Sequence, residues 1–271
     1  MTKKNKDSRA RTIAVLNHKG GVGKTSSVAN IGEVLAKMGK RVLLIDLDAQ
    51  ANLSTLFENR TEEPIGEKSI LSAFRSAITP GEKKILPFYK VKENLYLSPS
   101  VLDLAGLDMI LSSAMGREYI LKRLLEDVSG DFDYILLDTP PSLGIIVYNA
   151  LIAADEVFVP LTPETLPYMG LNTIESLCDT ISSSLSLEVG ITGVFFTRVE
   201  KGSLQSIVIE QVRKRYGERV FSTMIRKNIS VAQAPLAGES LFDFAPKSNA
   251  AEDYTRLAKE ILKRIDNNSK R

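Results

Sequence analysis

A glycine-rich segment near the start of the chain has the composition of an anion-binding loop. Residues 12–25 read TIAVLNHKGGVGKT, an apolar run with β-propensity followed by glycines and then by Lys24 and Thr25. Glycine adopts the backbone angles at which consecutive N–H groups converge on one anion, and a helix beginning at Lys24 adds its positive end there. In such a loop Lys24 would contact the β and γ phosphates of a nucleotide, and the Thr25 hydroxyl would bind Mg²⁺.

The loop differs from the usual phosphate-binding pattern in two respects. That pattern has glycine five residues before Gly23, where this chain has His18. A second lysine, Lys19, lies at the mouth of the loop. His18 is the single histidine of the chain, and we interpret it as a residue that shapes the turn rather than as a catalytic group.

Acidic residues follow two apolar runs that read as strands. The segment VLLIDLDAQ places Asp46 and Asp48 at the end of one run, and YILLDTPPS places Asp138 at the end of another. A nucleotide hydrolase uses carboxylates at such strand ends to hold a metal ion and to position water. One carboxylate alone could instead cap a turn, but three of them on the side of the glycine-rich loop favour the hydrolase.

A sheet is needed to bring these residues together, and the hydropathy pattern predicts one. Short apolar runs alternate with segments of helical period, which is typical of parallel strands joined by crossover helices. Runs such as VLLI and YILL are apolar on both faces, as in a sheet covered by helices on each side. The sequence therefore predicts an α/β fold, a doubly wound and mostly parallel sheet with helices on both faces, of the P-loop NTPase type.

The same pattern predicts the elements and their grouping. We expect one domain over residues 12–266, with a flexible basic tail at 1–11 and a polar tail at 267–271. We interpret the irregular stretch 58–92 as an excursion on the sheet edge. The predicted strands are 12–17, 41–46, 94–97, 134–138, 156–161, 192–197 and 221–225. The predicted helices are 24–38, 70–77, a pair between 101 and 127, 168–184, 204–216 and 250–265.

The composition excludes several classes of protein. The 271 residues include 35 Lys and Arg against 33 Asp and Glu, a net charge of +2 that does not by itself indicate nucleic-acid binding. The single cysteine, Cys178, excludes a disulfide framework and any metal site built from several thiolates of one chain. Its place in an apolar helical stripe favours a core thiol over a nucleophile. This low cysteine usage leads us to expect a cytoplasmic protein. An apolar run of about 18 residues, as a spanning helix needs, does not occur.

Several motifs together point to one family. They are KGGVGKT, DLDAQANLS, ILLDTPPSLG, VPLTPETLPYMGL and APLAGESLFDFAPKSNAAEDYTRLAKEIL. The chain resembles the ParA/Soj branch of the deviant Walker ATPases, the ParA/MinD family, over roughly residues 12–266. The resemblance implies an ATPase that binds ATP and Mg²⁺ and forms a homodimer around two sandwiched ATP molecules. Its ATP hydrolysis would be weak without a partner protein. The resemblance also implies nonspecific binding of that dimer to double-stranded DNA, stimulation by a ParB-like partner, and a nucleoid-associated role in partitioning a chromosome, plasmid or mobile element.

The resemblance assigns roles to the residues of the loop. Lys24 matches the phosphate-binding lysine, Thr25 a ligand of Mg²⁺, and Asp138 the Walker B carboxylate that also binds the metal. Lys19 matches the signature lysine that crosses the dimer to the other subunit's phosphates. The implied nucleotide-binding residues are Lys19, Gly20, Gly21, Val22, Gly23, Lys24, Thr25, Ser26 and Asn228.

The segment after the second predicted strand carries two further roles and one departure. Asp48 matches an aspartate that positions the attacking water, and Asp46 one that supports the metal shell. The family often has Pro and Gly in this segment, where this chain has Ala49 and Ala51. That difference bears on the stiffness of the loop.

A second departure concerns the late loop that contacts the base. The family often has Pro-Arg-Asn there, and this chain reads Arg226, Lys227 and Asn228. A basic residue used by the family in DNA binding is replaced by Ser230. Of the residues that contact the base, the asparagine is retained. Because Ser230 is not basic, DNA contacts must come from other residues.

The candidate DNA surface is a locally basic segment. Between 201 and 227 it carries only Glu210 and Glu218 as acids, which leaves a local charge of +5. The helix dipole offers an equally simple reason for the cations that end the helix at 204–216. The candidate DNA-contacting residues are Lys201, Arg213, Lys214, Arg215, Arg219, Arg226 and Lys227.

Two other functions on the same fold are considered. A MinD-like ATPase that cycles on membranes would need apolar surface on the last helix, which instead ends in DNNSKR, so we expect no membrane partner. A metabolic or metal-cluster ATPase, like the nitrogenase iron protein, would need cysteines that this chain lacks.

Overall fold

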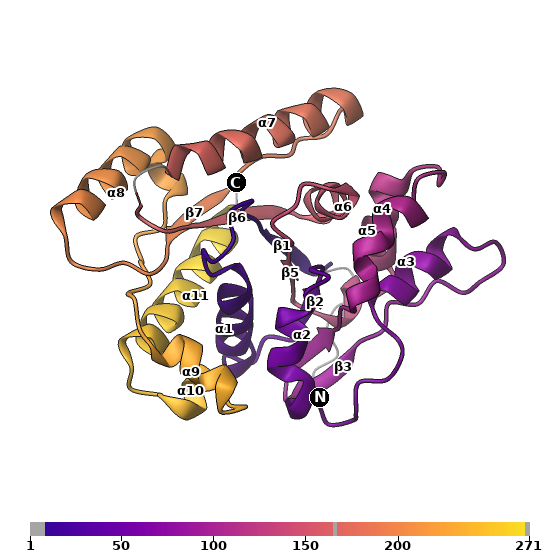
Figure 1. The fold of residues 1–271 in the computed structure, drawn as a ribbon, viewed down its shortest axis with the longest axis horizontal. Helices are drawn as coiled ribbons and strands as arrows, with labels where there is room; N and C mark the ends of the chain where they lie inside the picture. Colours follow the sequence, from indigo (N-terminus) through magenta and orange to yellow (C-terminus); the bar gives the residue numbers. More distant parts are fainter. Residues whose placement is uncertain (1–8, 165–166, 269–271) are drawn as a thin grey trace.

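The computed structural model describes residues 9–164 and 167–268, and its centre is a mostly parallel β-sheet (Figure 1). In the described residues seven strands form one sheet in the order β3-β4-β2-β5-β1-β6-β7. Neighbouring strands are parallel except for β3 and β4, which are antiparallel. The strands are β1 (Arg11–Val15), β2 (Val42–Asp46), β3 (Tyr89–Lys92), β4 (Leu95–Ser98), β5 (Tyr134–Asp138), β6 (Glu156–Leu161) and β7 (Gly193–Phe196).

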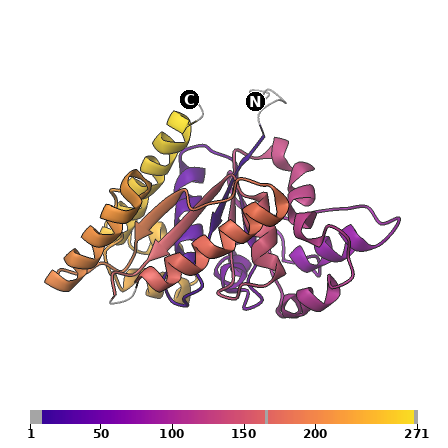
Figure 2. The same cartoon turned by 90° about the horizontal axis from the view of Figure 1, so that it is seen from above.

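Alternate residues of the central strands belong to different hydrophobic cores. In β2, Val42 and Leu44 pack into the core that contains α1 and α11, whereas Leu43 and Ile45 pack into the core on the other face. Both faces are therefore covered by helices, and Figure 2 shows α7 and α11 on opposite sides of the strands. The predicted α/β fold of the P-loop type is confirmed, and every residue of β2 and β5 is buried, as a sheet covered on both faces requires.

The helices follow the strands in the predicted alternation. The long ones begin within a residue of the predicted positions. The helices are α1 (Lys24–Lys37), α2 (Asn52–Phe57), α3 (Ile70–Ile78), α4 (Leu107–Ile110), α5 (Ile120–Glu126), α6 (Ile145–Ala153), α7 (Pro167–Leu185), α8 (Ser203–Tyr216), α9 (Ser230–Leu236), α10 (Leu241–Phe244) and α11 (Asn249–Asn268). Short 3₁₀ turns occur at Glu58–Arg60, Leu102–Gly106, Arg117–Tyr119, Ser129–Asp131 and Gly217–Arg219. None of these described helices is long and apolar enough to cross a membrane.

Helix α6 was not predicted because its sequence has no helical period. IIVYNALIA is apolar around the whole helix, and most of its residues are buried between neighbouring elements. Amphipathic spacing is the signal that reveals a surface helix, and a helix buried on all sides lacks it. The short helices α2, α9 and α10 were missed for a related reason, since few turns give little periodicity.

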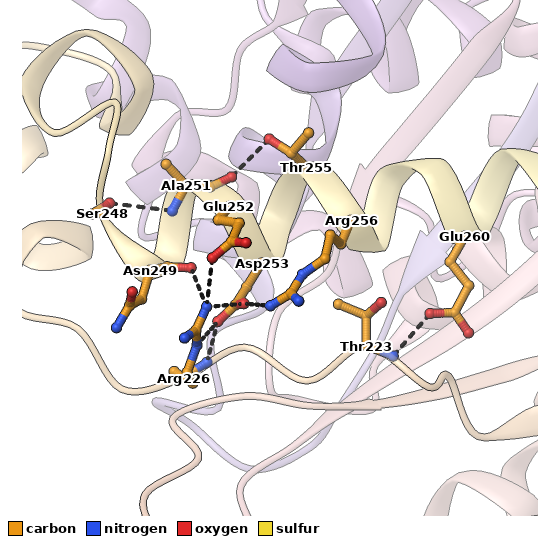
Figure 3. Close-up of polar contacts among 10 residues, drawn as sticks. All are labelled: Thr223, Arg226, Ser248, Asn249, Ala251, Glu252, Asp253, Thr255, Arg256 and Glu260. Atoms are coloured by element: carbon orange, nitrogen blue, oxygen red, sulfur yellow. Dashed lines mark hydrogen bonds and ion pairs between the residues drawn. The ribbon is translucent and has the colours of Figure 1, made fainter.

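The predicted strand at 221–225 is wrong. The segment runs beside β7, where the amides of Phe221 and Ile225 donate to Val194 and Phe196 at 2.7 and 2.8 Å. Between these two bonds the amides of Ser222 and Thr223 turn away and donate to the carboxylate of Glu260 on α11 at 2.7 and 2.9 Å. Because a side chain takes these amides, a continuous ladder cannot form. Figure 3 shows the Thr223 contact.

The ends of the predicted domain also differ from the sequence prediction. β1 begins at Arg11, inside the predicted tail, because the Ala10 and Arg11 amides already donate to Ser129 and Asp133 at 2.9 Å. At the other end α11 continues to Asn268, into the predicted polar tail. Residues 1–8 and 269–271 of the two predicted tails lie outside the described residues. The irregular stretch 58–92 does lie at the sheet edge, where it supplies β3, an antiparallel strand that was not predicted.

Candidate active site

A cleft of about 930 Å³ opens at the carboxyl ends of β1, β2 and β5. Parallel strands of an open α/β sheet place their ligand sites at this edge, because the loops that follow the strands meet there. The glycine-rich loop contributes Gly20, Gly21, Gly23, Lys24, Thr25 and Ser26 to the lining. The loops after β2 and β5 and the segment 104–108 contribute Leu47, Asp48, Ala49, Gln50, Leu104, Ala105, Leu107, Asp108, Pro140, Pro141, Ser142 and Gly144.

The glycine-rich loop has the backbone of an anion-binding site. Gly21 and Gly23 adopt φ values of 75° and 84°, which residues with a side chain rarely adopt. Helix α1 begins at Lys24, and no side chain caps its N-terminus. Its first amides therefore lack a side-chain acceptor, and a phosphate would satisfy them while interacting with the helix dipole.

Lys24 is a buried cation at the floor of this loop. The residue is only 7% exposed, and its Nζ donates to the carbonyl of Lys19 at 3.3 Å. Burial lowers the pKa of Lys24, while the nearby carboxylates of Asp138 and Asp48 act in the opposite direction. An anion bound in the cleft would supply the partner that favours the charged form.

Asp138 has unsatisfied acceptors. It is 1% exposed, and neither carboxylate oxygen accepts a hydrogen bond from the described residues. Burial raises the pKa of Asp138 well above its usual value, and Asp46 adds to the shift, while Thr25 and Lys24 favour the charged form. A buried carboxylate without donors fits a divalent cation, since a metal ion would satisfy both oxygens.

The donor set agrees with magnesium rather than with a metal held in a protein cage. Among residues 9–164 and 167–268 no group of three or more His, Cys, Asp or Glu side chains could hold a metal ion. Mg²⁺ is usually bound through one or two carboxylates, waters and the phosphates of a substrate. The pair Asp138 and Thr25 is of that kind.

Asp46 is placed differently from Asp138, although both are buried. Its Oδ2 accepts bonds from the Ser54 amide and hydroxyl at 2.8 and 2.7 Å, and its Oδ1 accepts from the Asp48 amide at 3.1 Å. Burial raises the pKa of Asp46 to about 6 against these hydrogen bonds. Its oxygens thus tie the start of α2 to β2, and Asp48, half-buried, reaches the lining of the cleft.

Lys19 lies outside the cleft in an ion pair. Its side chain is 55% exposed, and its Nζ is 2.5 Å from a carboxylate oxygen of Glu164, which follows β6. The hydrogen bond from Lys19 is the main cause that lowers the pKa of Glu164. Sequence reasoning missed Glu164, although it lies within VPLTPETLPYMGL, one of the motifs that carry the resemblance.

The late loop with Asn228 is anchored to α11 and does not line the cleft. Figure 3 shows Arg226 against Asp253, to which its backbone amide, Nε and Nη2 donate at 3.0, 2.8 and 2.7 Å. Asp253 is fully buried and also accepts a bond from Arg256. The side chain of Asn228 accepts a bond from the Ser230 amide at 2.9 Å and so shapes the start of α9.

The basic residues between 201 and 227 fall into two groups. Lys201, Arg213 and Lys214 are exposed on or beside α8. The remaining four have acceptors or rings of the protein itself as neighbours. Arg215 pairs with Glu175, Arg219 lies over Tyr216, Arg226 pairs with Asp253, and Lys227 pairs with Glu200.

The surroundings of His18 and Cys178 fit structural rather than catalytic roles. His18 is half-buried, and a Cβ on Gly170 of α7 would come within 3.2 Å of its ring. Cys178 is buried in the core under α7, and burial raises the pKa of its thiol to about 11. A thiol of that kind is a poor nucleophile at neutral pH.

Comparison with known proteins agrees with this geometry. A family model described as an AAA domain matches residues 10–190. The chromosome-partitioning ATPase Soj of Treponema pallidum is 36% identical over 260 residues, which cover 94% of this chain and 98% of that protein.

Two solved structures have the same fold. Cobyrinic acid a,c-diamide synthase from Mycobacterium smegmatis, with bound ADP and magnesium, is 30% identical with a TM-score of 0.77, covering 95% of this chain and 96% of that one. A plasmid partition protein from Borrelia burgdorferi B31, bound to AMPPNP, is 25% identical with a TM-score of 0.77, covering 95% and 100%. This chain therefore belongs to the ParA/Soj family of P-loop ATPases, which act in partitioning.

Proposed function

We propose that this partitioning ATPase binds ATP and Mg²⁺ in the cleft, dimerises in that state, and then binds double-stranded DNA nonspecifically. The observation that carries the nucleotide site is the pairing of an uncapped helix start with a buried Lys24 and a buried Asp138 that lacks donors. Each of these groups is unfavourable in an empty pocket and is satisfied by a phosphate with its cation.

Different residues at the cleft would have different roles in ATP hydrolysis. Lys24 and the amides of the loop hold the phosphates, and Thr25 and Asp138 hold Mg²⁺, with Asp46 supporting them. The metal ion supplies positive charge against the charge on the phosphate oxygens. Asp48 lines the cleft and accepts or orients a water proton near the γ-phosphate.

The position of Lys19 supports dimerisation. Its ammonium group is exposed and points to Glu164 rather than into the cleft of its own subunit. We infer that it leaves Glu164 to reach the nucleotide of a second subunit, where it would stabilise charge that develops on the γ-phosphoryl group. Hydrolysis would then require the dimer and be slow for the isolated chain, and a ParB-like partner would stimulate it.

The proposed DNA surface is centred on the exposed cations Lys201, Arg213 and Lys214. Arg215, Arg219, Arg226 and Lys227 are proposed as secondary contacts, because each would have to share its charge with an existing neighbour. Each subunit carries only a modest positive charge, and a dimer doubles the number of cations that can contact DNA phosphates. Because ATP would bring about dimerisation, the affinity for DNA would depend on ATP. We therefore propose a cytoplasmic, nucleoid-associated protein.

The alternative, a MinD-like membrane cycle, is less well supported by the last helix. The apolar side of α11 is buried in the core beside α1, through Tyr254, Leu257, Ala258, Ile261 and Ile265. An anchoring helix needs apolar area that remains free after packing.

The test compares the binding of the protein to DNA with its binding to lipid vesicles. The full chain with ATP and Mg²⁺ is mixed either with a DNA duplex of arbitrary sequence or with vesicles containing anionic lipid, and sedimentation or flotation measures binding. We expect ATP-dependent binding to DNA and none to vesicles. Flotation with vesicles in ATP but not ADP would replace the partitioning proposal by the membrane cycle.

A further inference from the structure

Two consecutive side chains after β7 hold carbonyl groups of the phosphate loop. Thr197 Oγ1 donates to the carbonyl of Val22 at 2.8 Å, and Arg198 Nη1 donates to the carbonyl of Gly21 at 3.2 Å. Thr197 also supports the loop from below, since a Cβ on Gly23 would lie 3.7 Å from its Cγ2. The loop is thus fixed by residues 175 and 177 positions away in the chain.

These contacts decide which way the loop amides point. In a trans peptide the C=O of one residue and the N–H of the next point in opposite directions. Holding the carbonyls of Gly21 and Val22 toward the end of β7 therefore turns the N–H groups of Val22 and Gly23 away from it. Gly21 and Gly23, on either side of Val22, line the cleft, so we infer that the N–H groups turned away from β7 are available to an anion bound there.

Arg198 adopts an unfavourable backbone conformation at this position. Its φ is 54°, in the left-handed region that L-residues other than Gly, Asn and Asp rarely occupy. Such a conformation persists only where surrounding contacts hold it, and functional sites are where it is most often found. Glu164, the partner of Lys19, lies near enough for the charge of Arg198 to act on it.

We propose that Arg198 is a positioning residue for nucleotide binding, which orients the Gly21–Val22 peptide so that the Val22 N–H faces the phosphates. It acts through the loop and does not itself touch the nucleotide. The inference rests on the nucleotide site proposed above. It adds a residue that the phosphate-loop motif does not contain.

The experiment measures the affinity of the full chain for MgADP and MgATP by calorimetry, together with the melting temperature without nucleotide. Arg198→Met removes the donor and keeps the length of the side chain, and we expect binding about three- to tenfold weaker, as the loss of one hydrogen bond gives. Arg198→Lys should recover part of the affinity, because an ammonium can still donate.

Arg198→Gly separates positioning from folding. Glycine accepts a φ of 54° without strain, so this variant should melt at or above the wild-type temperature and yet bind nucleotide as weakly as Arg198→Met. A merely structural arginine would lower both quantities together. Wild-type affinity in Arg198→Met and Arg198→Gly would overturn the inference.

Two controls keep the inference apart from the proposed site. Arg75→Met changes an exposed arginine of α3 outside the cleft and should leave affinity unchanged; an equal loss there would contradict a specific role for Arg198. Lys24→Ala tests the site itself. If Lys24→Ala loses binding and Arg198→Met does not, the inference alone fails, whereas wild-type binding by Lys24→Ala would show that the nucleotide site is misplaced.

Discussion

Asp46 and Asp138 are register partners at the ends of β2 and β5, and both carboxyl groups are buried. They differ in what surrounds their oxygens. Asp46 accepts three hydrogen bonds from Ser54 and Asp48, whereas Asp138 accepts none from the described residues. Asp138 therefore keeps acceptor capacity for a cation, whereas the hydrogen bonds of Asp46 hold the neighbouring loop in place.

Lys24→Ala is expected to weaken the binding of MgATP by about tenfold or more. Charge-assisted hydrogen bonds contribute roughly 1.5 to 3 kcal/mol each, and truncation removes at least one of them. Isothermal calorimetry measures the change. Lys37→Ala, at the far end of the same helix, serves as the control and should bind normally; unchanged affinity in Lys24→Ala would refute the assignment.

Lys19→Ala and Asp48→Ala should fail at different steps. Asp48→Ala should bind ATP and dimerise but hydrolyse slowly, because it lacks the group that acts on water. Lys19→Ala should bind ATP as a monomer, because it lacks the group that bridges subunits. Size-exclusion chromatography with light scattering and a phosphate-release assay distinguish the two.

A matched control removes the ion pair of Lys19 while keeping the lysine. Glu164→Gln should dimerise with ATP, since the Lys19 ammonium is still present. Normal ATP-dependent dimers of Lys19→Ala would show that this lysine is not the contact between subunits.

DNA binding should depend steeply on salt and on the cations of α8. With about six phosphates neutralised by a dimer, the affinity for DNA should fall roughly a thousandfold between about 50 and 200 mM salt. The logarithm of the affinity falls with the logarithm of the salt concentration at a slope near −0.9 per phosphate contact. The triple variant Arg213→Ala/Lys214→Ala/Arg215→Ala should have a shallower slope than wild type. With ADP, the wild-type protein should show about half the slope, because a monomer makes half as many phosphate contacts. Fluorescence anisotropy on two unrelated duplexes measures it.

The control for that experiment is a pair of exposed lysines in the irregular stretch at the other edge of the sheet. Lys83→Ala/Lys84→Ala should retain the wild-type slope. A wild-type slope in the triple variant would instead assign the DNA contacts to the N-terminal tail or to Arg226 and Lys227. A strong preference for one duplex would contradict nonspecific binding.

Ala51→Gly should stabilise the protein by about 0.5 to 1 kcal/mol. Ala51 has a φ of 52° at the start of α2, which costs an L-residue roughly 1–2 kcal/mol, and the greater freedom of glycine in the unfolded chain offsets part of the gain. Urea unfolding measures it. Ala49→Gly, at a position without a positive φ, should instead destabilise, so the same gain in both variants would rule out relief of strain.

Asp253 should make stability fall in acid. Burial alone would raise the pKa of Asp253, but hydrogen bonds from Arg226 and Arg256 outweigh it and hold the pKa below its usual value. A carboxylate with a lowered pKa stabilises the fold above the unfolded-state pKa of about 3.9, and this contribution is lost as pH falls through the folded-state value.

Asp253→Asn isolates that contribution. At neutral pH it should lower the free energy of unfolding by about 1.5 to 3 kcal/mol, the range for hydrogen bonds to charged groups. The difference from wild type should begin to shrink as the pH falls below about 5 and should keep shrinking as the pH falls through the lowered folded-state pKa. Chemical unfolding across this range measures it, and a difference that stays constant with pH would contradict the charged state assumed for Asp253.

Much of the fold was predictable because its signals are local. Central strands are apolar on both faces, and the long helices carry a 3.6-residue period, so β5, β6 and α8 were placed within a residue of their observed bounds. Helix α6 has no such period, and the segment 221–225 has the composition of a strand but gives two amides to Glu260. A contact made by a distant helix leaves no trace in the local pattern.

The sequence by itself determined the chemistry of the site, because residue types at fixed spacing in one loop specify phosphate and metal binding before folding. Tertiary structure decided which groups are left unsatisfied. Ser54 donates to Oδ2 of Asp46, whereas the oxygens of Asp138 have no donor among the described residues, and Lys19 forms an ion pair with Glu164. Tertiary structure also locked Arg226 onto Asp253 and brought Arg198 to the carbonyl of Gly21. Apart from Asp46 and Ser54, these pairs join segments at least 27 residues apart in the chain, so only the packing of strands and helices could bring their charges and hydrogen bonds together.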